Sequence, residues 1–261
     1  MKIIAVTGSP DSGKTAVAFS LAARFAEAGT ETIVLCADRT APTVPAVFPR
    51  TTSAVGAPAD KIHSLGKITK TVEISEKDIL DELVSIPNRK HLGFLGYAYG
   101  ENGGSYPPLN TADVENVFQA ASKICGCMIV DCVSGFSGDA ISSAAIAAAG
   151  KVICVGGCRY KDIVYYASQA GPLTRLIYGQ DNAESRKLKE TIIVLNKVSP
   201  YDAVAEVDRF YPHVDLVIPY DSDVREQFFE GTFVLKRLPK KFEKGISRLF
   251  AETGELNNIG G

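Results

Sequence analysis

The sequence lacks a strong charge of either sign. Its 261 residues include 28 Lys and Arg and 30 Asp and Glu, which gives a formal net charge of −2 at pH 7. Such a balance provides no overall field that would attract the chain to nucleic acid or to an anionic membrane. Any such partner must therefore be bound through a local patch.

The sequence also lacks a long apolar segment. The first apolar run, residues 2–7, is too short for a signal peptide and ends at Gly8. The longest weakly polar stretch, residues 140–158, is interrupted by Lys151, and it predicts a helix and a buried strand rather than a membrane span. We therefore expect a cytoplasmic protein.

The six cysteines lack the spacing of a zinc site. Zinc frameworks pair two C-x-x-C or C-x-x-C/H-x-x-H elements, whereas this chain has a C-x-C at Cys125 and Cys127. In a reducing compartment we expect free thiols, which pack as small hydrophobic side chains.

The chain has no Pro/Ser-rich linker and no internal repeat, so we expect one domain over residues 1–261. Apolar, β-rich segments recur between helix-length amphipathic segments, at residues 2–7, 32–37, 91–95, 127–132, 151–156, 191–196 and 214–218. Their hydrophobicity is continuous, which is typical of strands covered on both faces. The sequence predicts a doubly wound α/β fold, with a mainly parallel sheet and helices on both faces. Residues 41–58 are the least regular stretch, and residues 96–108 are expected to form a surface loop.

The clearest motif is a phosphate-binding loop. Residues 8–15, Gly-Ser-Pro-Asp-Ser-Gly-Lys-Thr, match G-x-x-x-x-G-K-[ST] between a strand and a helix. In such a loop backbone N–H groups face phosphate oxygens, Lys14 neutralises β/γ charge and Thr15 ligates Mg²⁺. The candidate nucleotide-binding residues are Gly8, Ser9, Pro10, Asp11, Ser12, Gly13, Lys14, Thr15 and Ala16.

Two further strands end in a carboxylate. Asp131 ends the strand at residues 127–132, where it could hold Mg²⁺ through water, and Gly135 could bring its N–H to a γ-phosphate. Asp38 follows the strand at residues 32–37 and could position an attacking water, although a carboxylate that only closes a turn fits the local sequence equally well. The catalytic candidates are Lys14, Asp38 and Asp131, and the metal-ligand candidates are Thr15 and Asp131.

In order and spacing these elements resemble the MinD/ParA branch of the P-loop NTPases, the deviant Walker A ATPases. The likeness covers most of the chain. The family patterns G-K-G-G-x-G-K-T, D-x-D, hhhD-x-P-x-G, N-[RK] and I-P correspond here to residues 8–15, 36–38, 129–135, 196–197 and 218–219. The resemblance implies ATP or ADP with Mg²⁺ as cofactors. It also implies that Asn196 binds the adenine edge and that Pro219 and Tyr220 pack against the base, although a polar turn explains Asn196 equally on local grounds.

Three positions depart from the family pattern. The signature lysine is Ser9, the first Asp of D-x-D is Cys36 and the proline of the third motif is Val133. In family members the lysine crosses an ATP-sandwiched dimer to the partner's phosphates. The resemblance thus implies an ATP-dependent dimer, and the missing lysine predicts slow or partner-dependent hydrolysis.

Loss of the lysine is similar to the atypical TadZ/CpaE members, which help place Tad-type pilus machinery at a cell pole. This likeness implies a nucleotide-switched positioning or assembly protein. Its expected partner is a protein of a pilus or partition system, with recruitment to the inner membrane face or a cell pole.

Two other functions stay open. An ATP-dependent ligase or kinase of the dethiobiotin-synthetase type also lacks the lysine, but residues 96–108 show no Arg/Lys cluster for an anionic acceptor. A DNA-binding partition ATPase is disfavoured because there is no basic surplus and no helix-turn-helix segment.

The segment near the C-terminus has one apolar helical face, formed by Phe242, Ile246, Leu249 and Phe250. With the basic residues outside this face it could lie on a membrane. We expect instead that the face packs on the core, so that direct membrane binding is not favoured.

Overall fold

The computed structural model describes residues 1–48, 62–69, 71, 73–86, 88–178 and 190–254. Within these ranges eight strands form one sheet in the order β3-β4-β2-β5-β1-β6-β7-β8. The strands are β1 (Lys2–Gly8), β2 (Thr32–Cys36), β3 (Val84–Ser85), β4 (Leu92–Leu95), β5 (Cys127–Asp131), β6 (Lys151–Gly156), β7 (Glu190–Val198) and β8 (Leu216–Pro219). Neighbouring strands pair in parallel, except that β3 runs antiparallel to β4 at one edge.

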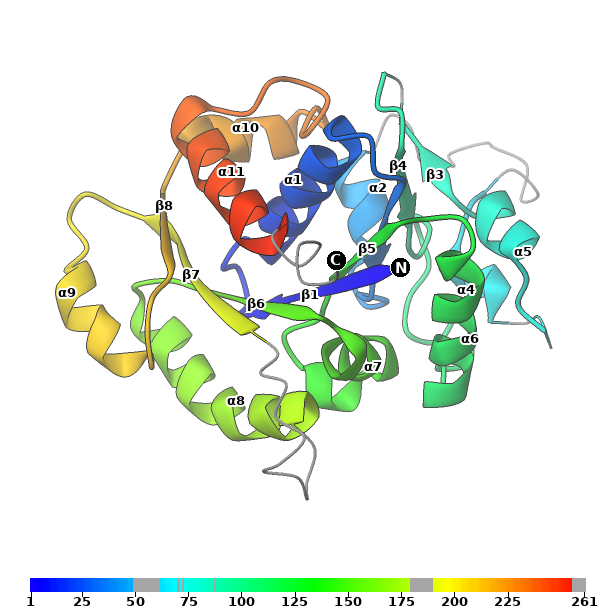
Figure 1. The fold of residues 1–261 in the computed structure, drawn as a ribbon, viewed down its shortest axis with the longest axis horizontal. Coiled ribbons are helices and arrows are strands. Elements are labelled where there is room, and N and C mark those ends of the chain that lie inside the picture. The colour runs from blue at the N-terminus through cyan, green and yellow to red at the C-terminus, as the bar shows by residue number, and fades with distance from the viewer. Residues whose placement is uncertain (49–61, 70, 72, 87, 179–189, 255–261) are drawn as a thin grey trace, which may run out of the picture.

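Helices cover both faces of the sheet (Figure 1), as predicted for a doubly wound fold. One face carries α1 (Lys14–Glu27), α2 (Thr43–Val47), α10 (Ser222–Phe229) and α11 (Lys240–Gly254). The other carries α4 (Leu65–Ile68), α5 (Glu76–Asp81), α6 (Thr111–Ser122), α7 (Ala140–Ala148) and α8 (Tyr160–Tyr178). The short α9 (Val204–Val207) lies near β8, and the 3₁₀ turns are η2 (Phe136–Gly138) and η3 (Asp208–Phe210).

The two layers of helices explain why the strands are apolar throughout. In β1, Ile4 and Val6 pack in the cluster beneath α1 and α11, whereas Ala5 packs in the opposite cluster with α6 and α7. Successive side chains of a strand point to opposite faces, so both sets are buried. The carboxyl ends of β1, β5 and β2 therefore meet at one edge, where ligands of open α/β sheets bind.

The seven predicted strands are confirmed, whereas the strand β3 and the helix α2 were not predicted. The edge strand β3 is only two residues long, too short to show a period in the sequence. Residues 43–47 form the helix α2 inside the stretch expected to be least regular, and residues 49–58 of that stretch lie outside the described residues.

The last helix packs on the core. Phe242, Ile246 and Leu249 of α11 are buried, and the helix contacts α1 and β8. This confirms the expected packing of its apolar face. In the part of the chain that is described, no helix combines the length and the apolar character needed to cross a membrane.

Candidate functional site

The phosphate-binding loop joins β1 to α1, and two glycines fix its path. Gly8 and Gly13 both have positive φ angles, 148° and 89°. A Cβ at Gly8 would overlap the backbone of Val155 in β6, and one at Gly13 would overlap the amide nitrogen of Asn196 in β7. The loop can lie this close to both strands only because these positions have no side chain.

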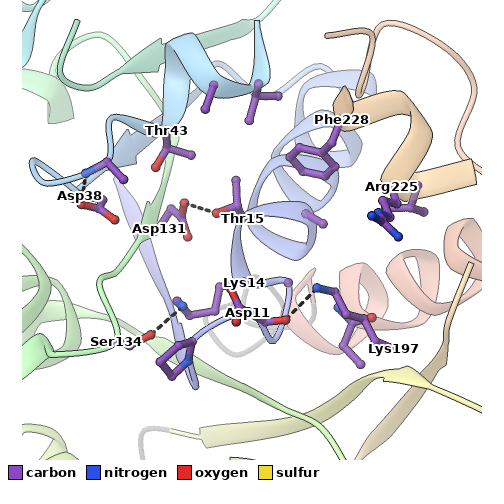
Figure 2. Close-up of a pocket in the computed structure, with 18 of the residues that line it drawn as sticks. Asp11, Lys14, Thr15, Asp38, Thr43, Asp131, Ser134, Lys197, Arg225 and Phe228 are labelled. Carbon is purple, nitrogen blue, oxygen red and sulfur yellow. Dashed lines mark hydrogen bonds between the residues drawn. The ribbon is translucent and has the colours of Figure 1, made fainter. Parts of the chain in front are cut away.

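The ammonium of Lys14 lies inside the site. Its Nζ donates to the Ser134 hydroxyl at 2.9 Å (Figure 2). It also donates to the Ser9 carbonyl at 3.3 Å. Burial lowers the pKa of Lys14, and the neighbouring Asp131 opposes that effect. A phosphate oxygen beside Nζ would supply the negative charge that such a buried cation requires.

Thr15 and Asp131 form the second polar centre. Thr15 Oγ1 donates to Asp131 Oδ2 at 2.7 Å, and this carboxylate is only 5% exposed. Its Oδ1 is buried and has no hydrogen-bond partner among the described residues. Burial raises the pKa of Asp131 to about 6. A hydroxyl beside an unpartnered carboxylate oxygen fits Mg²⁺, which prefers oxygen ligands, so Thr15 and Asp131 would hold that ion.

Asp38 both closes a turn and lines the site. Its Oδ1 accepts from the backbone N–H groups of Thr40 and Ala41, at 2.8 and 2.9 Å. The carboxylate lies near Asp131 in the same cavity (Figure 2). The turn explains the position of Asp38, and Oδ2, which accepts no hydrogen bond from the described residues, is available to a water.

The side chain of Asn196 does more than close a turn, because it is buried and bonded to the phosphate-binding loop. It is 4% exposed, and its Nδ2 donates to the Ser12 carbonyl at 2.8 Å. Its Oδ1 accepts no hydrogen bond within the described ranges. The side chain thus fixes the phosphate loop and keeps an acceptor for a ligand. The next residue, Lys197, donates from Nζ to the Asp11 carbonyl at 2.7 Å.

These residues surround one cavity of about 590 Å³. Of the predicted residues, those that line it are Pro10, Asp11, Gly13, Lys14, Thr15, Ala16, Asp38, Asp131, Asn196, Pro219 and Tyr220. Gly8, Ser9, Ser12 and Gly135 do not line it. Pro10 lines it without donating, because proline has no backbone N–H.

Sequence analysis did not predict that α2 and α10 line the cavity. These helices contribute Thr43, Ala46, Val47, Val224, Arg225 and Phe228, and Phe242 of α11 joins them. Phe228 and Arg225 lie across the site from Asp38 and Asp131 (Figure 2). No motif marks these residues, because ordinary amphipathic helices supply them.

Comparison with known proteins finds solved structures that have this fold. No protein-family model matches the sequence, and no curated protein matches it significantly. Among solved structures, MinD of Pyrococcus horikoshii complexed with Mg-ADP has a TM-score of 0.68 at 17% identity, over 99% of this chain and 98% of that one. A ParA-family ATPase of Chlorobium tepidum has a TM-score of 0.71 at 16% identity, over 96% and 99%. A protein assigned to plasmid partition in Borrelia burgdorferi, bound to AMPPNP, has a TM-score of 0.70 at 11% identity, over 97% and 100%.

The fold is that of the MinD and ParA ATPases. Within this MinD/ParA fold the second residue of the phosphate loop is held in an unexpected way. Ser9 is 1% exposed, and its hydroxyl donates to Asp162 Oδ1 at 2.6 Å. Asp162, in the first turn of α8, is fully buried and also accepts from Arg159 Nε at 2.8 Å and Nη2 at 3.0 Å.

The Ser9–Asp162–Arg159 cluster ties the phosphate loop to α8. Arg159 Nη2 also lies 3.4 Å from the Pro10 carbonyl. The Ser9 side chain therefore points to α8 and is absent from the cavity lining. Sequence reasoning missed Asp162 and Arg159 because they lie about 150 residues from the motif.

Proposed function

We propose that this chain binds ATP and ADP with Mg²⁺ and acts as a MinD/ParA-like, nucleotide-switched positioning or assembly protein. One observation carries the proposal. Lys14, Thr15 and Asp131 converge in one cavity at the carboxyl edge of the sheet, and Asp131 Oδ1 is buried without a partner in the described residues. Unpaired buried polar atoms are costly, and a metal–phosphate group would satisfy this one.

Each part of a nucleotide has a partner here. Backbone N–H groups of the loop and the N-terminus of α1 suit the β-phosphate, and Lys14 suits the charge between the β- and γ-phosphates. Thr15 and Asp131 would hold Mg²⁺, which when bound neutralises phosphate oxygens. Asn196 Oδ1 suits the adenine amino group, which donates hydrogen bonds, and Pro219 and Tyr220 would pack against the base.

The similar structures support this assignment, since one holds Mg-ADP and another AMPPNP. The chain acts in this proposal as one cytoplasmic domain that forms an ATP-dependent dimer. Its partner is a protein of a Tad-type pilus or a partition system, at the inner membrane face or a cell pole. The pilus assignment rests on Ser9, because the signature lysine is missing there. Hydrolysis is slow or partner-dependent, since Ser9 replaces the signature lysine that would stabilise the transition-state charge from the opposite subunit.

Calorimetry with ATP and ADP tests nucleotide binding. Lys14→Ala should weaken ATP binding by roughly 10- to 150-fold, the value of a hydrogen bond to a charged group. Lys244→Ala is the matched control, because Lys244 is exposed on α11. Chelation of Mg²⁺ should weaken ATP binding to the wild type as well. Equal affinities for wild type and Lys14→Ala would refute the proposal.

A second experiment tests the switch. Wild type and Lys14→Ala are used as bait in a native extract with ATP or with ADP, and the captured proteins are compared. A partner retained by wild type in one nucleotide state, and lost with Lys14→Ala, is expected. ADP production that instead requires an added small-molecule acceptor would favour a metabolic ligase or kinase.

A further inference from the structure

The loop that follows β5 presents one hydroxyl to the phosphate site. Ser134 Oγ lies 2.9 Å from Lys14 Nζ, and Ser134 lines the cavity, whereas the predicted Gly135 does not. The hydroxyl accepts from Lys14, and its own proton has no acceptor in the described part of the chain. A hydroxyl in this position is free to donate to an anionic oxygen.

Three bonds hold the backbone of this loop. Tyr165 of α8 donates its OH to the Ser134 carbonyl at 2.7 Å. On the other side, the Val133 N–H donates to Ser142 Oγ at 3.0 Å, and Ser143 Oγ donates to the Phe136 carbonyl at 2.7 Å. Burial raises the pKa of Tyr165, so its phenol stays protonated and remains a donor. The backbone around Ser134 is therefore held in place, and the bond from Lys14 directs its hydroxyl into the cavity.

The position of Ser134 determines which phosphate of a nucleotide its hydroxyl would contact. The backbone of the phosphate-binding loop cradles the inner phosphates, and the motif lysine reaches the β- and γ-phosphates. Ser134 belongs to the loop after the neighbouring strand β5, three residues beyond Asp131, and so lies outside the cradle. Because Ser134 Oγ is within hydrogen-bond distance of Lys14 Nζ, it can share a phosphate oxygen with Lys14, and the oxygens that the cradle does not already bind are those that project beyond it. Those oxygens belong to the terminal phosphate of a triphosphate.

We propose that Ser134 is a ligand of the terminal phosphate and that Tyr165 is the positioning residue that holds it in place. Ser134 and Tyr165 together give the site a higher affinity for a nucleoside triphosphate than for a diphosphate. This inference rests on the proposed nucleotide binding and deepens it. Since Tyr165 and Asp162 both belong to α8, the same helix contacts the phosphate loop and the loop that senses the terminal phosphate.

The test compares AMPPNP with ADP, each with Mg²⁺, by calorimetry on the full chain. Ser134→Ala should lower AMPPNP affinity about tenfold, the size of one hydrogen bond to a charged group, and should change ADP affinity less than twofold. Ser134→Thr keeps a hydroxyl and should retain most of the AMPPNP affinity. Tyr165→Phe keeps the ring and should lower AMPPNP affinity two- to threefold, again without effect on ADP.

Ser168→Ala is the matched control. It removes an exposed hydroxyl of α8 that donates to the Val164 carbonyl of the same helix, so it should leave the AMPPNP-to-ADP affinity ratio unchanged. Circular dichroism establishes that each variant folds. If Ser134→Ala changes both affinities equally, or neither, while wild type binds both nucleotides, the inference is overturned and nucleotide binding stands. If wild type binds neither nucleotide, the proposed function fails and the inference fails with it.

Discussion

The buried carboxylate of Asp162 should be a major stabilising group. It is fully buried and accepts three hydrogen bonds, one from Ser9 and two from Arg159. Replacement by alanine removes all three acceptor contacts at once. The phosphate loop then loses its buried side-chain connection to α8, while the exposed pair of Lys161 and Asp11 remains.

The expected loss follows from the exposure of each donor. Ser9 is 1% exposed, so its hydroxyl would be left buried without an acceptor, at a cost of about 1–3 kcal/mol. The Arg159 side chain is 50% exposed and can return to water, so its contribution is that of a surface pair, about 0–1 kcal/mol. Asp162→Ala should therefore lower the free energy of unfolding by about 1–4 kcal/mol.

Urea denaturation followed by circular dichroism measures this loss. Asp81→Ala is the control, because Asp81 is exposed at the end of α5, and it should change stability by less than about 0.5 kcal/mol. A double-mutant cycle with Ser9→Ala should give a coupling energy of about 1 kcal/mol or more. The reasoning would be refuted if Asp162→Ala unfolded at the same urea concentration as Asp81→Ala.

Three further outcomes follow from burial and hydrogen bonding. Asn196→Ala should reduce the preference for ATP over GTP about two- to tenfold, which competition binding would reveal, and an unchanged ratio would remove Asn196 from the base site. Ile246→Ala should destabilise the chain by about 2–5 kcal/mol in urea denaturation, because Ile246 is fully buried; a loss no larger than that of the exposed Arg248→Ala would contradict this. Cys158, the least buried thiol, should react with iodoacetamide before Cys154, whose pKa burial raises to about 12. Mass spectrometry of the native protein that found both labelled at equal rates would contradict the last claim.

The sheet was predictable because strands that are buried on both faces have a simple sequence pattern. A strand covered by helices on each side must be apolar at every position, and β5 shows this in Cys127–Val130 before it ends at Asp131. That rule fails for β3, where Val84 is buried and Ser85 is exposed. An edge pair of two residues gives the sequence no pattern to read.

The functional residues also divide into those that local sequence patterns predict and those that they do not. Lys14 and Thr15 lie in a contiguous motif, and Asp131 lies where a parallel strand ends, so local rules find them. Ser134 lies inside the third motif, but its contact with Lys14 is not part of that motif's pattern. The contact of Asp162 with Ser9 and that of Tyr165 with Ser134 arise from packing of α8 against two loops, and no spacing in the sequence predicts them. Such contacts follow only from the folded arrangement of the chain.

Asp11 in the phosphate-binding loop departs from the family motif, yet the loop keeps its backbone conformation. Asp11 has a φ of 60°, at a place where the resembling family carries glycine. Aspartate tolerates the left-handed region better than most residues, and two lysines hold this one. Lys197 Nζ donates to its carbonyl, while Lys161 Nζ pairs with its carboxylate at 2.9 Å and lowers its pKa. At Gly8 and Gly13, by contrast, a side chain would overlap β6 or β7, and no neighbouring charge could relieve that overlap. The loop therefore requires glycine at Gly8 and Gly13, whereas it accommodates aspartate at position 11.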